Sequence, residues 1–227
     1  RWWLADAADR DAAAPALADR VEWAVFSLLS TAGPMSESAF YERIATMFTG
    51  HDLPDETLVR ACLESYRSPD STPERLVTRD DLLTRSQQHS ELIAAIADGG
   101  HRLGMRVWLS EREQGRRHGR GKLGDLLGER ERNAYLGGIA RSVETLAEVD
   151  VIWYIRHKVA LLFEVEWTAI LGDTLLRRHA RIAPDDKLVR FLVIAPERTD
   201  LVRHKLERSP LLRAALGRIP EETETAL

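Results

Sequence analysis

The sequence contains very little cysteine, because Cys62 is the only one among 227 residues. This count excludes a disulfide framework and a cysteine-rich zinc site, and it makes a reducing cytoplasm the expected location. The seven histidines are scattered and form no H-x-x-x-H pair. A zinc enzyme is therefore not expected either.

Several signatures of nucleotide binding and of nucleophilic catalysis are also missing. There is no G-x-G-x-x-G that follows an expected strand, no G-x-x-x-x-G-K-[ST], and no G-x-S-x-G. The segment GRGKLG at 119–124 pairs a glycine with a lysine, but it does not follow a strand directly. Dinucleotide-binding enzymes, P-loop enzymes and serine hydrolases are therefore not expected.

The chain also lacks a long apolar run and a marked excess of one charge. No apolar run approaches the roughly 18 residues of a membrane-spanning helix, so we expect no membrane partner. The N-terminal stretch has no apolar signal-peptide core and begins on Arg1 rather than Met, so we expect the chain to be part of a longer parent protein. The formal net charge is −4, so any affinity for nucleic acid has to come from local basic clusters.

A composition of 44% hydrophobic and 30% charged residues is that of a globular protein with a sizeable core. Apolar spacing predicts three short helices over residues 19–66, followed by a short strand at 75–78. This pattern fits a winged helix, and it fits a small helical packing bundle equally well. We therefore expect a small helical module over residues 1–75.

Residues 76–227 predict an α/β (α+β) domain with a mixed sheet flanked by helices. In chain order we expect a helix at 80–101, a strand at 104–110, a mobile loop at 111–124, a helical stretch at 125–135, strands at 148–155 and 159–168, a helix at 169–181, a strand at 188–196 and a helix from about 199.

Three carboxylates interrupt the most apolar part of this domain. Glu164 and Glu166 point to one face of their strand, because successive side chains of a strand alternate between faces. Asp150 comes to lie opposite them if the two expected strands form a hairpin. Like charges this close repel unless a cation or a proton holds them, and such oxygen ligands suit Mg²⁺ or Mn²⁺. Alternatively, the glutamates form the exposed face of an edge strand and pair with Arg156 or Lys158.

A basic, glycine-rich segment lies between the first expected strand and the strand of Asp150. Its cations suit contacts with DNA phosphates, although a merely solvated linker would have the same composition. The expected DNA-binding residues are Arg116, Arg117, Arg120 and Lys122.

The order of elements, with an aspartate on the second strand and F-E-V-E on the third, resembles the PD-(D/E)XK nuclease superfamily over about residues 79–215. This resemblance implies a restriction-endonuclease-like fold and a Mg²⁺-dependent deoxyribonuclease in which Asp150 and Glu164 hold the metal. Glu91 matches an acid that some branches carry on the leading helix. Glu166 stands where the family has a lysine, so it either serves the reaction, for instance as a ligand of a second metal, or marks an inactive site.

The resemblance also suggests accessory residues. The cationic role of the missing lysine would pass to Arg177, Arg178 or Lys205, and Thr168 would position a ligand. Three of these residues have a simpler explanation. Thr168 can be a helix cap, and Arg177 and Arg178 can belong to a solvated helix face. A weaker resemblance links RWWL, DRVEWAVFSLL and RLGMRVW to C-terminal regions associated with bacterial DNA methylases, and it implies a setting of DNA modification or defence.

We therefore expect a metal-dependent DNA endonuclease that acts in restriction–modification, defence or repair, as a homodimer or together with the rest of a parent chain. The alternative is a catalytically inactive DNA-binding or assembly domain of a larger DNA-modifying protein. A third hypothesis is a protein-docking domain that attaches through Trp2 and Trp3.

Overall fold

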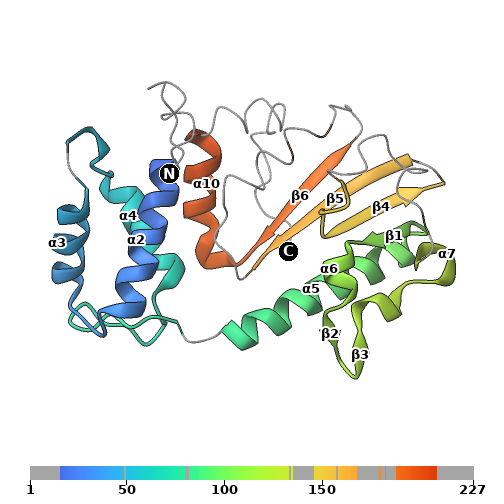
Figure 1. Cartoon of the computed structure of the whole chain (residues 1–227), viewed down its shortest axis with the longest axis horizontal. Coiled ribbons are helices and arrows are strands. Elements are labelled where there is room, and N and C mark those ends of the chain that lie inside the picture. Colours follow the sequence, from blue (N-terminus) through green and yellow to red (C-terminus); the bar gives the residue numbers. More distant parts are fainter. Residues whose placement is uncertain are drawn as a thin grey trace, which may run out of the picture. The chain divides into compact units, whose positions relative to one another are not determined.

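The contacts between residues divide the chain into two units, drawn in Figure 1. The helical unit contains the residues up to Asp80 together with Asp200–Lys205, and the sheet unit contains most of the remainder. The structure is a computed structural model. It describes residues 16–48, 50–79, 82–132, 134, 146–156, 158–167, 179, 182 and 188–208.

Three helices form most of the helical unit, as the apolar spacing predicts: α2 (Leu17–Thr31), α3 (Glu37–Met47) and α4 (Glu56–Tyr66). Side chains placed before two of them fix where these helices begin. The hydroxyl of Ser36 accepts the N–H of Ala39 before α3, and the carboxylate of Asp55 accepts the N–H of Leu58 before α4. Each cap satisfies a backbone donor that the first helical turn leaves without a partner.

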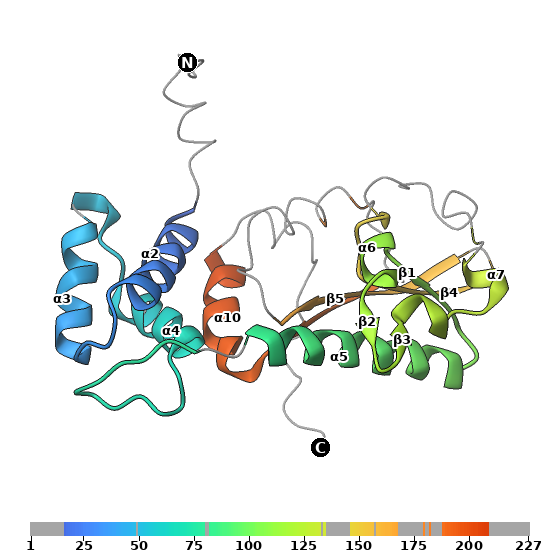
Figure 2. The same ribbon diagram turned by 60° about the horizontal axis from the view of Figure 1, so that its bottom comes forward.

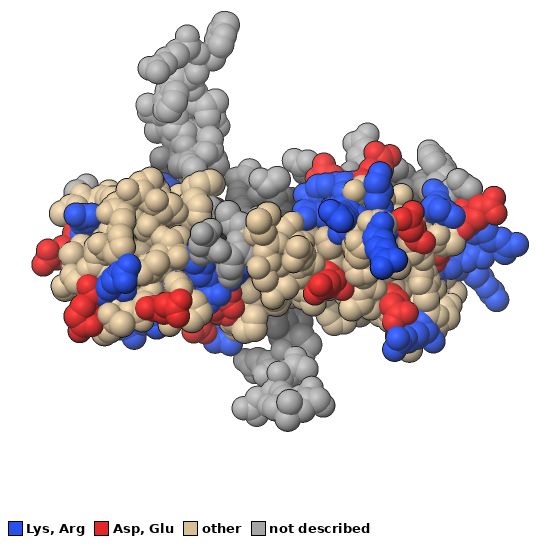
Figure 3. Space-filling view, turned by 90° about the horizontal axis from the view of Figure 1, so that it is seen from below, with Lys and Arg blue, Asp and Glu red and all other residues tan. Residues whose placement is uncertain are grey.

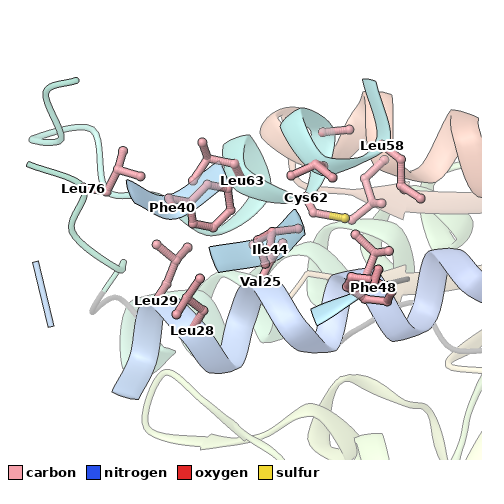
Figure 4. Packing of buried hydrophobic residues seen from close by; sticks show 14 of the residues in the cluster. Val25, Leu28, Leu29, Phe40, Ile44, Phe48, Leu58, Cys62, Leu63 and Leu76 are labelled. Atoms are coloured by element: carbon pink, nitrogen blue, oxygen red, sulfur yellow. The ribbon is translucent and has the colours of Figure 1, made fainter. Parts of the chain in front are cut away.

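The apolar faces of these helices meet in one core, shown in Figure 4. Phe40, Cys62 and Leu63 are fully buried there, so the only cysteine serves packing. The expected strand at 75–78 is wrong, because this segment makes only isolated bridges: Thr72 to Arg75, Met35 to Leu76 and Arg67 to Thr78. The partners of these bridges lie at helix ends and in loops, so the bridges cannot continue into a regular β-ladder. Within the described part of this unit there is no regular strand.

A four-stranded sheet organises the other unit, in the order β1-β4-β5-β6. The strands are β1 (Arg106–Leu109), β4 (Val151–Ile155), β5 (Lys158–Glu166) and β6 (Val189–Ile194). The pairs β1–β4 and β4–β5 are antiparallel, whereas β5 and β6 are parallel. The expected mixed sheet is therefore confirmed. Because β5 lies between two strands, the alternative of an exposed edge strand is wrong.

Helix α5 (Leu82–Arg102) packs along one face of this sheet, as Figure 2 shows. Ile93 and Ala97 contact this face and are fully buried. A Cβ atom at Gly100 would stand 2.8 Å from the side chains of both Trp153 and Val107, so only glycine allows the helix to approach this closely. The opposite face carries a second cluster around Trp108, Ile152 and Leu162, and it is also the face of Glu164.

Residues 111–124 are not the mobile loop that their composition predicts. They form a short helix α6 (Glu111–Gln114), a hairpin of β2 (Arg117–His118) and β3 (Gly121–Lys122), and the start of a 3-10 turn, η2 (Leu123–Leu126). Two buried side chains, Glu113 and Leu123, order the segment, and such single anchors leave no periodic signal. The helical stretch expected at 125–135 is η2 followed by α7 (Glu129–Arg132), and residues 133 and 135 lie outside the described residues.

The C-terminal part begins with a 3-10 turn, η4 (Pro196–Arg198), and continues in α10 (Thr199–Arg208). Leu201 of α10 joins the core of the helical unit. The helix expected at 169–181 lies outside the described residues, apart from His179. Among the helices that the structure describes, none has the length and apolarity that crossing a membrane requires.

Candidate active site

The acids singled out from the sequence occupy one end of the β4–β5 hairpin. Asp150 directly precedes β4, and Glu164 and Glu166 lie near the end of β5. Val151 pairs with Phe163, so Asp150 stands at the next position, opposite Glu164. The carboxylate of Asp150 accepts the backbone N–H of Val165 at 2.8 Å, between the two glutamates. Asp150 and Glu164 are only 1% and 2% exposed.

The charge of Glu164 acts on the pKa of both Asp150 and Glu166. Burial, and then the charge of Glu164, raise the pKa of Asp150 above its ordinary value. Burial, followed by the charges of Asp150 and Glu164, raises the pKa of Glu166 to about 7. Both shifts have the sign expected when like charges share a poorly solvated space. The site therefore carries more negative charge than its surroundings solvate well.

An arginine from α6 reaches this acidic group. The Nη2 atom of Arg112 lies 2.7 Å from Oδ1 of Asp150, and its Nε atom lies 2.9 Å from Oε1 of Glu113. The side chain of Arg112 is nevertheless 65% exposed, whereas both acids are buried. The sequence placed Arg112 in a basic segment that could overhang the carboxylates, but it did not pair Arg112 with Asp150, which lies 38 residues further along the chain.

Glu113 holds this arginine in place. Its carboxylate is fully buried and contacts Nε2 of His89 at 3.1 Å and Nε of Arg116 at 2.8 Å, in addition to Arg112. Burial acts to raise the pKa of Glu113. The hydrogen bond to His89 and the charges of His89, Arg116 and Arg112 outweigh burial, so the pKa is lowered overall. Glu113 is thus ionised, and its charge holds the guanidinium of Arg112.

A second basic side chain contacts Glu164 directly. The Nε2 atom of His179 lies 2.7 Å from Oε1 of Glu164, and both side chains are buried. His179 did not stand out in the sequence, because a lone histidine without a partner at metal-ligand spacing carries no signal. Asp150 therefore contacts an arginine, and Glu164 contacts a histidine.

The other residues suggested for the site lie elsewhere or outside the described structure. Glu91 is exposed on α5. Lys205 lies on α10 in the helical unit, where its Nζ contacts Oδ1 of Asp19 at 2.7 Å and also pairs with Glu22. The remaining three, Thr168, Arg177 and Arg178, lie outside the described residues.

The basic residues suggested for DNA contact lie on the β2–β3 hairpin and next to it. Arg117, Arg120 and Lys122 are exposed, whereas Arg116 is partly buried by its ion pair with Glu113. Figure 3 shows Lys and Arg side chains gathered over α6 and this hairpin. The hairpin belongs to the same unit as the carboxylates. This surface is therefore suited to a polyanion.

The carboxylates have the chemistry of a Mg²⁺ or Mn²⁺ site, because hard divalent cations prefer carboxylate oxygens. Among the described residues, however, no three His, Cys, Asp or Glu side chains are grouped so that they could hold a metal ion. One oxygen of Asp150 faces Arg112, and one oxygen of Glu164 faces His179. Asp150 and Glu164 fit such a metal if Arg112 and His179 release the two carboxylate oxygens that they contact.

A mixed sheet covered by α5, with acids where two neighbouring strands meet, is consistent with a restriction-endonuclease-like domain. Comparison with known families agrees. Residues 71–219, more than half of the chain, match the family described as the type II restriction enzyme NmeDI C-terminal domain, and the chain belongs to this family. No curated protein and no solved structure matches the chain. The resemblance inferred from the sequence is thus confirmed at the level of a restriction enzyme domain.

Proposed function

We propose that this chain is a metal-dependent DNA endonuclease domain of a restriction–modification system, with a PD-(D/E)XK-type site that uses Mg²⁺ or Mn²⁺. One observation carries the proposal. In a member of a restriction enzyme family, the buried acids Asp150 and Glu164 stand opposite each other on neighbouring strands, with Glu166 close enough to share their charge.

Asp150 and Glu164 would hold the divalent ion through their carboxylate oxygens. The bound ion would stabilise the charge that develops on the phosphate and make water more acidic. Glu166 would accept a proton from the attacking water, because its carboxylate lies close enough to Asp150 and Glu164, which would hold the ion, for their charges to act on it. In this way a glutamate can serve the reaction at the position where a lysine is expected.

The exposed cations of the β2–β3 hairpin, Arg117, Arg120 and Lys122, would contact the DNA backbone. Such contacts are independent of base sequence and weaken as salt rises. Gly119 has a positive φ of 56° at the tip of the hairpin. A backbone without a side chain at this point allows a close approach to phosphate.

A second candidate function rests on the contacts at the acids. Because Arg112 and His179 already engage Asp150 and Glu164, the site can be stable without metal, as in a DNA-binding or assembly domain that has lost cleavage. The two candidates differ in their response to a divalent ion. Only the endonuclease requires these carboxylates to bind one.

Cleavage of plasmid and oligonucleotide DNA with Mg²⁺ or Mn²⁺ tests the proposal. The informative variants are Asp150→Asn and Glu164→Gln, which keep side-chain size and remove charge. Asp98→Asn is a matched control, because Asp98 is an exposed acid on α5 that pairs with Arg102. We expect cleavage by the wild type and by the control, and its loss in both site variants. Salt-sensitive DNA binding without cleavage at any metal concentration would favour the second candidate.

A further inference from the structure

We propose that Arg112 takes over the task of the lysine that the site lacks. In the metal-free protein it forms an ion pair with Asp150. When a divalent ion binds to Asp150, the guanidinium of Arg112 is released and binds the phosphate at the cleavage site. This inference rests on the proposed nuclease function and adds a catalytic residue to it.

The position of Arg112 supports this role. Its Nε is held at 2.9 Å by the fully buried Glu113, so the guanidinium stays near the acids even when another of its contacts changes. Its Nη2 reaches Asp150 at 2.7 Å, and the structure gives Nη1 no hydrogen-bond partner among the described residues. The side chain is 65% exposed, so a ligand can approach it.

Its chemistry also matches a phosphate. The planar guanidinium offers five N–H donors in a fork that binds two phosphate oxygens at once. With Nε fixed by Glu113, the Nη groups remain to be shared between Asp150 and a substrate. A preorganised cation of this kind stabilises the charge that develops during phosphoryl transfer.

A divalent ion and Arg112 compete for Asp150. Oδ2 of Asp150 is fixed by the N–H of Val165, and Oδ1 is the oxygen that Arg112 contacts. A metal ligated by Oδ1 would place two positive charges within a few ångströms of the guanidinium, and this repulsion favours release of Nη2. The same event that loads the metal therefore frees the arginine for the phosphate.

The other cations near the acids are less suited to this task. The charge of Arg198 acts on Glu166, but its side chain is only 1% exposed. Arg116 is held on Glu113 with 29% of its side chain exposed. Lys205 belongs to the helical unit. Arg112 combines direct contact with an acid of the site and an exposed side chain.

The test compares Arg112→Met and Arg112→Lys with the wild type. Arg102→Met is the matched control, because Arg102 is an exposed arginine on α5 that pairs with Asp98. Three quantities are measured at pH 8. They are Mn²⁺ affinity without DNA by calorimetry, DNA affinity in Ca²⁺ by fluorescence anisotropy, and the single-turnover cleavage rate in Mn²⁺.

We expect Arg112→Met to bind Mn²⁺ several-fold more tightly, because the competing cation is gone. It should bind DNA in Ca²⁺ more weakly and cleave on the order of 100-fold more slowly, the usual effect of removing one stabilising donor. Arg112→Lys should recover part of the rate, whereas Arg102→Met should match the wild type. A merely structural arginine would not make metal binding tighter and cleavage slower at the same time.

The proposal is overturned if Arg112→Met binds Mn²⁺ no more tightly than the wild type, or if it cleaves DNA at the wild-type rate. If the wild type itself does not cleave, the proposed function fails. The Mn²⁺ titration and the DNA affinity in Ca²⁺ then still decide whether Arg112 competes for Asp150 and binds phosphate. The two failures are therefore distinguishable.

Discussion

The carboxylate of Asp150 accepts a hydrogen bond of 2.8 Å from the backbone N–H of Val165, the residue between Glu164 and Glu166. This bond ties the residue before β4 to the strand that carries both glutamates, and it leaves the other oxygen of Asp150 to Arg112. Asp150 thus has a structural contact in addition to its charge. Substitutions can separate these two contributions.

We expect Asp150→Asn and Asp150→Ala to abolish cleavage alike but to differ in stability. The amide oxygen of Asn can still accept the N–H of Val165 and carries no charge next to Glu164. Since the pKa of Asp150 is raised, the fold disfavours its charged form, and Asp150→Asn should be at least as stable as the wild type at pH 8. Asp150→Ala leaves a buried N–H without its partner and should be less stable than Asp150→Asn by about 1–2 kcal/mol. Urea unfolding in EDTA measures this difference, and equal stability of the two variants would contradict the structural contact.

The stability of the metal-free protein should fall as pH rises from about 4.5 to about 7. The folded pKa of Glu166 is about 7, above the ordinary value of 4.5, so unfolding releases a proton within this window. The folded state therefore loses stability with rising pH, by at most about 3 kcal/mol from this one group. Urea unfolding in EDTA at pH 5, 6, 7 and 8 gives the dependence.

Glu166→Gln is the matched variant for this pH dependence. It should remove much of the decrease, while the raised pKa of Asp150 contributes a smaller decrease of the same sign. Added Mg²⁺ should stabilise the wild type more at pH 8 than at pH 6, because the ion binds ionised carboxylates. An unchanged pH slope in Glu166→Gln would show that Glu166 does not carry the shifted pKa.

Replacing Arg117, Arg120 and Lys122 by Gln should weaken DNA binding and reduce its dependence on salt. Each phosphate contact contributes about 0.9 to the slope of log K against log salt, so three lost contacts should reduce the slope by about 2 to 3. Arg116 is left in place because it is paired with Glu113. Fluorescence anisotropy between 50 and 200 mM salt is the measurement. Arg102→Gln serves as the control, and an unchanged slope in the triple variant would rule out the hairpin as the DNA-contacting surface.

We expect Lys205→Met to lower stability without impairing the reaction. Lys205 is buried with Glu22 and Asp19 in the helical unit, and Tyr66 donates its hydroxyl to the same Glu22. Removing the cation leaves a buried carboxylate poorly compensated, which typically costs about 3–5 kcal/mol. Thermal unfolding and cleavage at low temperature separate the two effects. If cleavage were lost while the fold stayed intact, Lys205 would act in the reaction after all.

The sequence was sufficient for the regular elements around the candidate site. Periodic apolar residues predicted α2 to α5 and the four strands of the main sheet, because burial on one face is a local property of a helix or a strand. The alternation along β5 also placed Glu164 and Glu166 on one face. The same reasoning wrongly predicted a mobile loop at 111–124. Single buried side chains such as Glu113 and Leu123 order this segment, and they produce no periodic pattern of apolar residues.

The sequence by itself determined the helices and strands that carry periodic apolar residues and which acids share a face, since both follow from spacing along the chain. Only the tertiary structure decided that β5 is an inner strand and that Arg112 and His179 contact the acids. These contacts join residues 38 and 15 positions apart. The distance between such groups depends on the order of strands and on where α6 packs, and neither is encoded in local periodicity.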